Sequence, residues 1–441
     1  MRTALSKRSF LFSSFLLFIT SQLAFSSPPE TASQTCPSTF RTATSQEESV
    51  ESPKELVSHN GLLEVSLTLR SSRDSTGQTQ YCYIDQFGDR SPTLRLRAGD
   101  LLVLKLTNEL SPEHDTGRDG EQSHASASKH SHSATKVTCA SGMMMVDSTN
   151  LHFHGLGISP SCHSDDSLHV MIPPSKTFIY RVRIPKNQPP GLYWYHPHPH
   201  GHSEEQVLGG ASGALIIEGI GAASPNVAGL PERVFVIRDQ KLRSETPLDQ
   251  THKDRAHKDA KADLSSSNAS VDASQRDPSI PAKDLSLNFI PITYPEYSVP
   301  TIHTRPLTRE FWRVLNASAD TYVNLGVLFN GEWSGKGLVA AHGSWQPLDL
   351  VALDGVPIER VAIDRMAISG KSNKSAGKAL PKTEILIPPG GRAEFILQTP
   401  AEGTQAELIT VGAETNPPMD EDSEPPTTSE NPLDNAEQCG G

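Results

Sequence analysis

Apolar and polar residues alternate along several short stretches in the first half of the chain. Leu63–Leu69 follows this pattern, as does Thr93–Arg97, and a Gly99-Asp100 turn then leads into the apolar run Leu101–Leu106. A period of two is typical of a strand with one buried face. Further strand patterns follow at Asn150–Gly155, Thr177–Ile184, Gly191–His200 and Gly213–Glu218, without a convincing amphipathic helix between them. Short strands at this spacing predict a β-sandwich.

A second set of strand patterns begins after Ala222. Its members are Arg233–Arg238, Leu285–Ile290, Arg309–Leu315, Leu348–Leu353, Thr383–Ile387 and Arg392–Gln398. We therefore predict an all-β chain with two tandem sandwiches, the first over residues 57–222 and the second over residues 230–412.

Four stretches have the polar, low-complexity composition of segments that do not fold by themselves. Residues 27–56 are expected to form a disordered arm, and residues 413–441 an acidic disordered tail. Inside the predicted sandwiches, residues 111–136 form a His-rich loop and residues 243–283 a polar insertion.

Residues 1–26 have the features of a signal peptide. Basic residues up to Arg8 precede the apolar run Leu11–Ala24, which is too short to span a membrane. Lys7-Arg8 also resembles a variant of the bacterial twin-arginine signal. We therefore expect an exported chain, periplasmic or secreted, without a membrane span.

The overall charge and the cysteines narrow the class of protein. The 441 residues carry a formal net charge of −12, which argues against general nucleic-acid binding. Five cysteines form no C-x-x-C pair; they are Cys36, Cys82, Cys139, Cys162 and Cys439. An exported chain can form disulfides. Because the number of cysteines is odd, at least one thiol would remain unpaired, and the sequence leaves open which cysteines pair.

Two pairs of histidines carry the candidate chemistry: His152-Phe-His154 and His196-Pro-His198. Residues i and i+2 of a strand project from the same face, so two neighbouring strands of this kind would converge four imidazoles. Four imidazoles of this kind suit copper, zinc or nickel. The alternative is that these histidines are core or pH-sensing residues. His200 and His202 continue the same face, but a structural or solvent-facing role is favoured for them.

These histidines lie in longer motifs that resemble the first domain of the multicopper oxidases, the family of laccases, ascorbate oxidase, bilirubin oxidase and bacterial copper-efflux oxidases. The motifs are Asn150-Leu-His-Phe-His-Gly-Leu156, Gly191-Leu-Tyr-Trp-Tyr-His-Pro-His198, Gln206 and Gly213-Ala-Leu-Ile-Ile-Glu218. Glu310–Ser318, Val351–Pro357 and Ile387–Ile396 resemble fold markers of the family's middle domain. The resemblance implies tandem cupredoxin-like Greek-key β-sandwiches.

The resemblance also implies copper as cofactor, with dioxygen and an electron-donor substrate as partners. In the family, a type 1 copper takes electrons singly from the donor, and a trinuclear cluster collects four to reduce dioxygen to water. By motif, His152 would bind the type 2 copper, and His154, His196 and His198 the paired type 3 coppers. The family also has a proton-delivering acid after the first motif. Asp165-Asp166 is placed for this role, with Asp166 preferred and a surface turn as the alternative.

Part of the family's ligand set has no counterpart in this sequence. The family's last domain supplies an H-x-x-H-x-H stretch and an H-C-H stretch, whose cysteine binds the type 1 copper. After His202 only isolated histidines occur, and Cys439 has no flanking histidine. The sequence thus offers four of the eight cluster ligands that the resemblance implies. We expect the third, C-terminal cupredoxin domain to be absent from the chain and to come from a longer gene product or a separate chain.

Two functions follow from these motifs. The favoured one is oxidation of a phenol-like or metal-ion donor with dioxygen as acceptor, for which this chain alone would be inactive. The alternative is an extracytoplasmic copper-binding or scavenging protein without turnover. A purely structural relic that binds no copper is a third possibility.

Overall fold

The computed structural model describes residues 36, 49–73, 78–110, 139, 145–199, 201–241, 283–292, 300–334, 337–339, 343–358 and 380–411. All of them lie in one compact unit, Thr35–Gly441. The predicted signal peptide, the His-rich loop, the acidic tail and the polar insertion up to residue 282 lie outside the described residues, as do His200 and Cys439.

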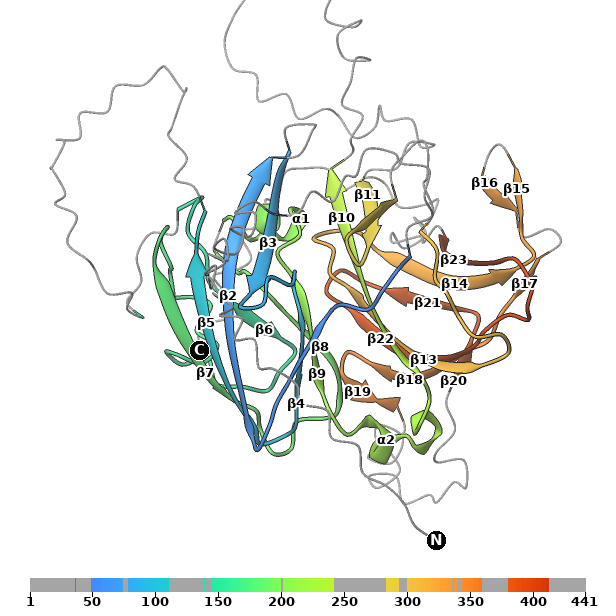
Figure 1. The fold of residues 1–441 in the computed structure, drawn as a ribbon, viewed down its shortest axis with the longest axis horizontal. Coiled ribbons are helices and arrows are strands. Elements are labelled where there is room, and N and C mark those ends of the chain that lie inside the picture. The colour runs from blue at the N-terminus through green and yellow to red at the C-terminus, as the bar shows by residue number, and fades with distance from the viewer. Residues whose placement is uncertain are drawn as a thin grey trace, which may run out of the picture. The chain divides into compact units, whose positions relative to one another are not determined.

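The first sandwich consists of two sheets (Figure 1), with the strand orders β1-β4-β9-β8-β6 and β3-β2-β5-β7. In β7, and in β2 as far as Leu69, every second side chain is buried, as the alternation predicted. These inward side chains of both sheets share one core. The strands are β1 Glu55–Val57, β2 Leu62–Arg73, β3 Thr79–Asp85, β4 Thr93–Leu96, β5 Leu101–Asn108, β6 His152–His154, β7 Thr177–Arg183, β8 Gly191–His196 and β9 Gly213–Ile217.

The second sandwich also consists of two main sheets (Figure 1). One has the order β12-β11-β10-β13-β22-β18-β19 with β20 beside β18, and the other has the order β17-β14-β21 with β23 beside β14. The strands are β10 Glu232–Lys241, β11 Lys283–Leu287, β12 Ile290–Ile292, β13 Arg309–Asn316, β14 Val323–Phe329, β15 Glu332–Ser334, β16 Gly337–Val339, β17 Ser344–Trp345, β18 Leu348–Leu353, β19 Val356–Pro357, β20 Leu380–Lys382, β21 Glu384–Ile387, β22 Arg392–Gln398 and β23 Ala406–Val411.

The prediction of an all-β chain with tandem cupredoxin-like sandwiches is confirmed. Neighbouring strands are often far apart in the sequence, as in β4-β9 and β13-β22, which is the connectivity that Greek-key sandwiches require. The exact domain boundaries stay predictions.

Some elements were missed. β3 and β14 are buried almost throughout, so they show no alternation. Helices α1 Ser203–Leu208 and α2 Ile220–Ala223, and the 3-10 turn Pro225–Val227, are too short to show a helical period. Among the described residues, none of the helices has the length and apolar character needed to cross a membrane.

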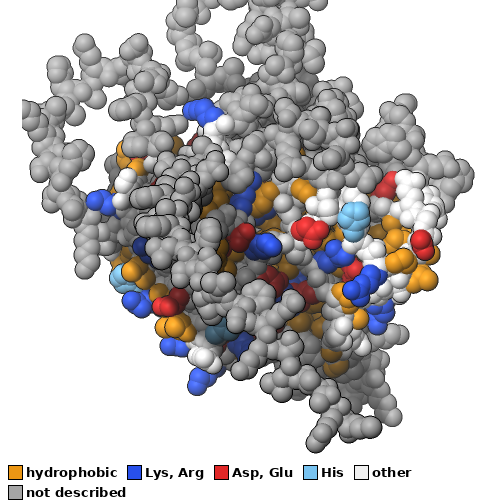
Figure 2. All heavy atoms as spheres, in the orientation of Figure 1, with side chains coloured by type: hydrophobic (Ala, Val, Ile, Leu, Met, Phe, Trp, Pro, Cys, Tyr) orange, Lys and Arg blue, Asp and Glu red, His pale blue; other side chains and the backbone are white. Residues whose placement is uncertain are grey.

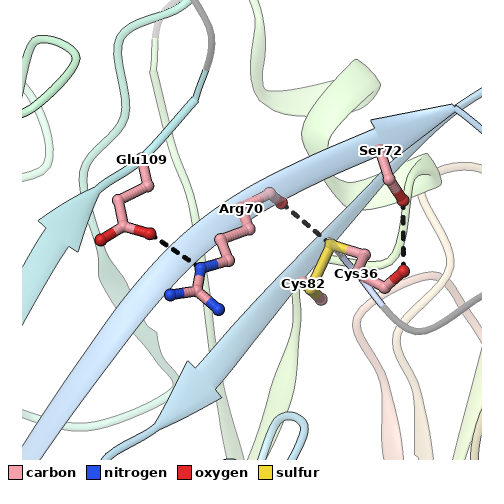
Figure 3. Close-up of a disulfide and its surroundings, with 5 residues drawn as sticks. All are labelled: Cys36, Arg70, Ser72, Cys82 and Glu109. Atoms are coloured by element: carbon pink, nitrogen blue, oxygen red, sulfur yellow. Dashed lines mark hydrogen bonds and ion pairs between the residues drawn. A yellow bond between two sulfur atoms is a disulfide. The ribbon is translucent and has the colours of Figure 1, made fainter. Parts of the chain in front are cut away.

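The predicted arm over residues 27–56 is not disordered throughout, and the prediction is wrong at its end. Strand β1 pairs in parallel with β4, and Val50 is buried in the core of the second sandwich. Cys36 is also fixed, because it forms a disulfide with Cys82 of β3 (Figure 3). Ser72 donates a hydrogen bond to the Cys36 carbonyl, so Cys36 is held against β2 and β3.

A second disulfide joins Cys139 to Cys162, with 5.6 Å between the Cα atoms. The two bridges resolve a pairing that the sequence left open, and they use four of the five cysteines. On the face drawn in Figure 2, Lys and Arg side chains are interspersed with Asp and Glu.

Strand β8 is buried on both faces, which explains its unbroken apolar sequence. Tyr193 and Tyr195 point into the core of the first sandwich. Leu192 and Trp194 point the other way, into a separate core that also contains Val234 of β10 and other residues of the second sandwich. The strand that carries the second histidine pair is therefore held between two cores.

Buried charges connect the same two sandwiches. Arg313 of β13 pairs with Glu394 of β22, and both side chains are only 1% exposed. Glu394 also accepts a hydrogen bond from the backbone N–H of Leu192 in β8, at 2.9 Å. On its other side, Arg313 pairs with Glu232, which in turn pairs with Arg95 of β4. A carboxylate buried in this way is stable only with its partners in place.

We predict that Glu394→Gln lowers the free energy of unfolding by about 3–5 kcal/mol, because Arg313 then loses its fully buried partner. Urea denaturation followed by tryptophan fluorescence measures this change. Arg309→Gln is the matched control, since it breaks the exposed pair of Arg309 with Asp349. It should cost less than about 1 kcal/mol. Equal effects of the two substitutions would contradict the prediction.

Candidate metal centre

The first histidine pair lies on the three-residue strand β6, and its neighbour in the sheet is β8. The two strands are antiparallel, and His152 is directly opposite His196. Phe153 and Tyr195, also opposite each other, are both buried in the core. Because side chains alternate along a strand, the histidines project from the other face. The structure therefore brings the two predicted histidine pairs side by side.

The imidazoles converge at this point. One ring nitrogen each of His152, His154 and His196 lies within 4.8 Å of the other two. The ring centroids of His152 and His198 are 5.6 Å apart, and those of His196 and His198 are 6.1 Å apart. Hence all four predicted histidines surround one small region.

His198 lies beyond the end of β8, which stops at His196 instead of continuing to His200. Pro197 has no N–H for the sheet ladder, so the strand ends there. Asn150 takes over the positioning of His198. Its buried side-chain oxygen accepts the His198 N–H at 2.7 Å, and its amide donates to the carbonyls of Ser167 and Val170. The sequence pattern alone did not single out this role of Asn150.

Neighbouring acceptors orient two of the rings. Nδ1 of His152 lies 3.0 Å and 3.1 Å from the two carboxylate oxygens of Asp165. Nδ1 of His196 lies 2.9 Å from the Pro197 carbonyl oxygen. A proton held on Nδ1 leaves Nε2 as the lone-pair nitrogen in both rings. In His154 it is Nδ1 that faces the other rings, at 3.4 Å from Nε2 of His196.

The structure places Asp165, and not the preferred Asp166, against the histidines. Besides His152, Asp165 accepts the backbone N–H of Phe153 at 2.9 Å. Asp166 instead lies 2.8 Å from Nδ1 of His169, whose side chain is 54% exposed. The contacts favour Asp165 over Asp166 as the acid beside the site, and which of the two delivers protons stays a prediction. The two acids are adjacent in sequence and both are buried, and the turn that follows the first motif decides which one contacts the histidine pairs.

Burial lowers the pKa of His154 to about 4, with smaller contributions from Arg392, His152 and His198. Burial also holds the pKa of His196 well below its ordinary value, although its hydrogen bond to the Pro197 carbonyl acts in the opposite direction. Both rings are thus neutral at pH 7, the protonation state in which an imidazole binds a metal.

The donor set fits copper. Neutral imidazole nitrogens bind Cu in proteins, and two of these rings already have the second hydrogen-bond acceptor that metal-bound histidines need. His202 is half-buried and precedes α1, with its N–H on the Pro199 carbonyl. A second group of possible ligand atoms, at Cys139, Cys162 and His163, includes the disulfide, so its sulfurs are not thiolates.

Comparison with known proteins agrees with these motifs. A family model described as multicopper oxidase matches residues 130–221. The multicopper oxidase mco of Staphylococcus epidermidis is 28% identical over 127 residues, which is 29% of this chain and 20% of that protein. The putative multicopper oxidase GMC1 of Saccharomyces cerevisiae is 29% identical over 131 residues, or 29% of this chain and 17% of that protein.

Solved structures of multicopper oxidases are also similar. The enzyme from Campylobacter jejuni, described as a metallo-oxidase, has a TM-score of 0.48 and 19% identity, over 89% of this chain and 63% of that one. McoA from Aquifex aeolicus has a TM-score of 0.46 and 16% identity, over 80% and 57% of the two chains.

The chain therefore carries a multicopper oxidase domain, and the resemblance recognised from the histidine motifs is confirmed. The sequence matches span about a fifth of the length of the curated relatives.

We predict that the metal-free protein becomes less stable as the pH falls from about 6.5 to about 4. In that range the histidines protonate more readily in the unfolded chain than in the fold, so the unfolded state gains stability as protons are added. The lowered pKa of His154 corresponds to up to about 3 kcal/mol. Urea denaturation with a chelator at several pH values tests this. A His154→Gln variant that loses as much stability as the parent would contradict it.

Asp165→Asn should lower copper affinity by about 10–100-fold, because His152 loses the carboxylate whose two oxygens hold its proton on Nδ1. Asp166→Asn, the same substitution at the adjacent acid, is the control. It should leave the affinity within about threefold of the parent, since the Asp166 side chain contacts His169. Isothermal titration of the purified chain with Cu²⁺ measures both. A larger loss of copper affinity in Asp166→Asn than in Asp165→Asn would instead support Asp166 as the acid of the site.

Proposed function

We propose that this chain is the front part of a multicopper oxidase, which oxidises phenol-like or metal-ion donors and reduces dioxygen to water. The observation that carries this proposal is the convergence of His152, His154, His196 and His198 from β6 and β8. The confirmed multicopper oxidase domain spans all four of these histidines.

In this proposal His152 holds the type 2 copper, while His154, His196 and His198 hold the type 3 pair. Copper, when bound, supplies one-electron redox chemistry that no side chain of the site has. The chain's own residues keep the imidazoles neutral and oriented. Asp165 would hold the proton on Nδ1 of His152 and, with a side chain only 10% exposed, is the member of the predicted Asp165-Asp166 pair that contacts the site and that we assign to proton delivery.

The proposal requires further ligands from outside the described residues. The histidines converge from one side, and the sequence contains no H-C-H stretch. We infer that a further cupredoxin domain, in a longer gene product or a separate chain, closes the cluster and supplies the type 1 copper. On this basis the chain alone holds copper but does not turn over.

Export of the chain is part of the same proposal. Two disulfides within the described residues favour an oxidising compartment, such as the periplasm or the exterior. They agree with the signal peptide predicted for residues 1–26.

The one-sided ligand set also favours the second candidate function, copper binding or scavenging without turnover. The His152 side chain is 26% exposed, so the half-site is open to a copper ion from solvent. The two candidates share a copper site and differ only in whether a partner domain completes it.

The test is copper binding by the full chain. We expect the chain to bind a stoichiometric amount of Cu²⁺, above a background from the histidines of residues 111–136. The double variant His196→Ala/His198→Ala should lose this stoichiometric binding and keep only the background. His59→Ala/His303→Ala is the matched control, because both side chains are exposed and lie outside the site. Unchanged copper binding in the site variant would refute the proposal.

The visible spectrum of the same samples tests the missing electron-entry site. We expect no intense blue charge-transfer band from the copper-loaded chain, and no oxygen uptake with a phenol. A strong blue band would overturn the ligand count. Sequencing the gene beyond this chain separates the two candidates: an H-C-H stretch in frame favours the oxidase, and its absence favours copper binding alone.

A further inference from the structure

The turn between β21 and β22 of the second sandwich lies directly against the metal site of the first. Gly390, in this turn, has φ +73°, and a Cβ built on it would lie 3.4 Å from Cε1 of His154 and 3.3 Å from Cζ2 of Trp194. The same Cβ would be 3.8 Å from Nε2 of His154. Nδ1 of His154 faces His196, and the neighbouring Cε1–Nε2 edge of the same ring lies against Gly390.

Trp194 extends this contact to the second histidine pair. Its ring stacks on His196 with centroids 4.1 Å apart and 27° between the planes. It also lies 5.1 Å from the His154 ring. The turn therefore packs directly against His154, and it reaches His196 only through the ring of Trp194.

Hydrogen bonds fix the turn itself. The Gly390 N–H donates to the Asn316 carbonyl at 2.8 Å, and the Asn316 N–H donates to the Gly391 carbonyl at 2.9 Å. Asp354 accepts the Arg392 N–H at 3.0 Å. The Arg392 guanidinium then donates to the carbonyls of Leu192 in β8 and of Gly390. The turn is thus tied to both sandwiches.

The same guanidinium accounts for the glycine that follows the first histidine pair. A Cβ built on Gly155, which has φ +87°, would lie 2.5 Å from Nη2 of Arg392. A side chain at position 155 would displace Arg392, and with it the support of the turn.

We propose that Gly390 is a positioning residue of the metal site, so that the second sandwich sets where the His154 and His196 rings lie. This inference rests on the proposed copper function. Its physical basis is that a metal site tolerates smaller displacements of its side chains than a packed core does. A methyl group at position 390 would push its neighbours by a few tenths of an ångström, which a packed core absorbs, whereas metal–ligand distances tolerate only about 0.2 Å.

The experiment compares Gly390→Ala with Gly403→Ala. Gly403 has nearly the same φ, +78°, but a Cβ there would meet nothing within 4 Å. Both variants therefore place alanine at a positive φ, and only Gly390→Ala adds a contact at the metal site. We expect Cu²⁺ affinity to fall at least about tenfold in Gly390→Ala and to stay at the parent value in Gly403→Ala. Equal affinities in the two folded variants would overturn the proposal.

A copper-free measurement separates this inference from the proposed function. In the metal-free protein, NMR ring-proton signals of His154 and His196 should shift in Gly390→Ala and not in Gly403→Ala. A shift in a chain that binds no copper at these histidines would defeat the proposed function but retain the positioning role. Unshifted signals would defeat the positioning role whatever the copper result.

Asp354→Gly keeps the test decisive if Gly390→Ala does not fold. Asp354 is 60% exposed and has φ +49°, so glycine suits its backbone while removing the carboxylate that holds Arg392. The loosened turn should lower copper affinity in the same direction, by less than Gly390→Ala. Parent affinity in Asp354→Gly would then count against the proposal.

Discussion

The burial of strand β8 on both faces is the constraint on which the metal site depends. Each large apolar side chain removed from water contributes about 1.5–3 kcal/mol, and β8 contributes such side chains to two cores. A strand with no solvent-exposed face cannot slip by one residue, since every side chain would then exchange cores. That fixed register holds His196 opposite His152 and keeps ring nitrogens of His152, His154 and His196 within 4.8 Å of one another.

Charge and backbone contacts reinforce the same strand from the second sandwich. Glu394 accepts a hydrogen bond from the N–H of Leu192, and Arg392 donates one to the carbonyl of Leu192. Two side chains of β22 thus hold both backbone groups of one residue of β8. A buried carboxylate is costly unless its charge is balanced, and Arg313 supplies that balance. The second sandwich is therefore part of the site's framework, although none of its described histidines lies in the site.

Much of this arrangement could be predicted from the sequence. Alternation gave the sandwiches, and the i, i+2 spacing placed each histidine pair on one face, because both depend on local geometry with a period of two. The choice between Asp165 and Asp166 depends on a turn whose conformation no periodicity encodes. The disulfide pairing and the contact of Gly390 with His154 depend on segments that meet only in the folded chain. Fully buried strands such as β3 were missed because they do not alternate.

These two hydrogen bonds to β8 also have a consequence for how the protein is made. Leu192 and its partners Arg392 and Glu394 are separated by about two hundred residues of chain. During synthesis, both histidine pairs are therefore complete long before the turn that supports them exists. Contacts between such distant residues require a costly loop closure and form slowly. Under the proposed copper function, a first sandwich that folds before β22 has its histidines but lacks the turn that packs against His154.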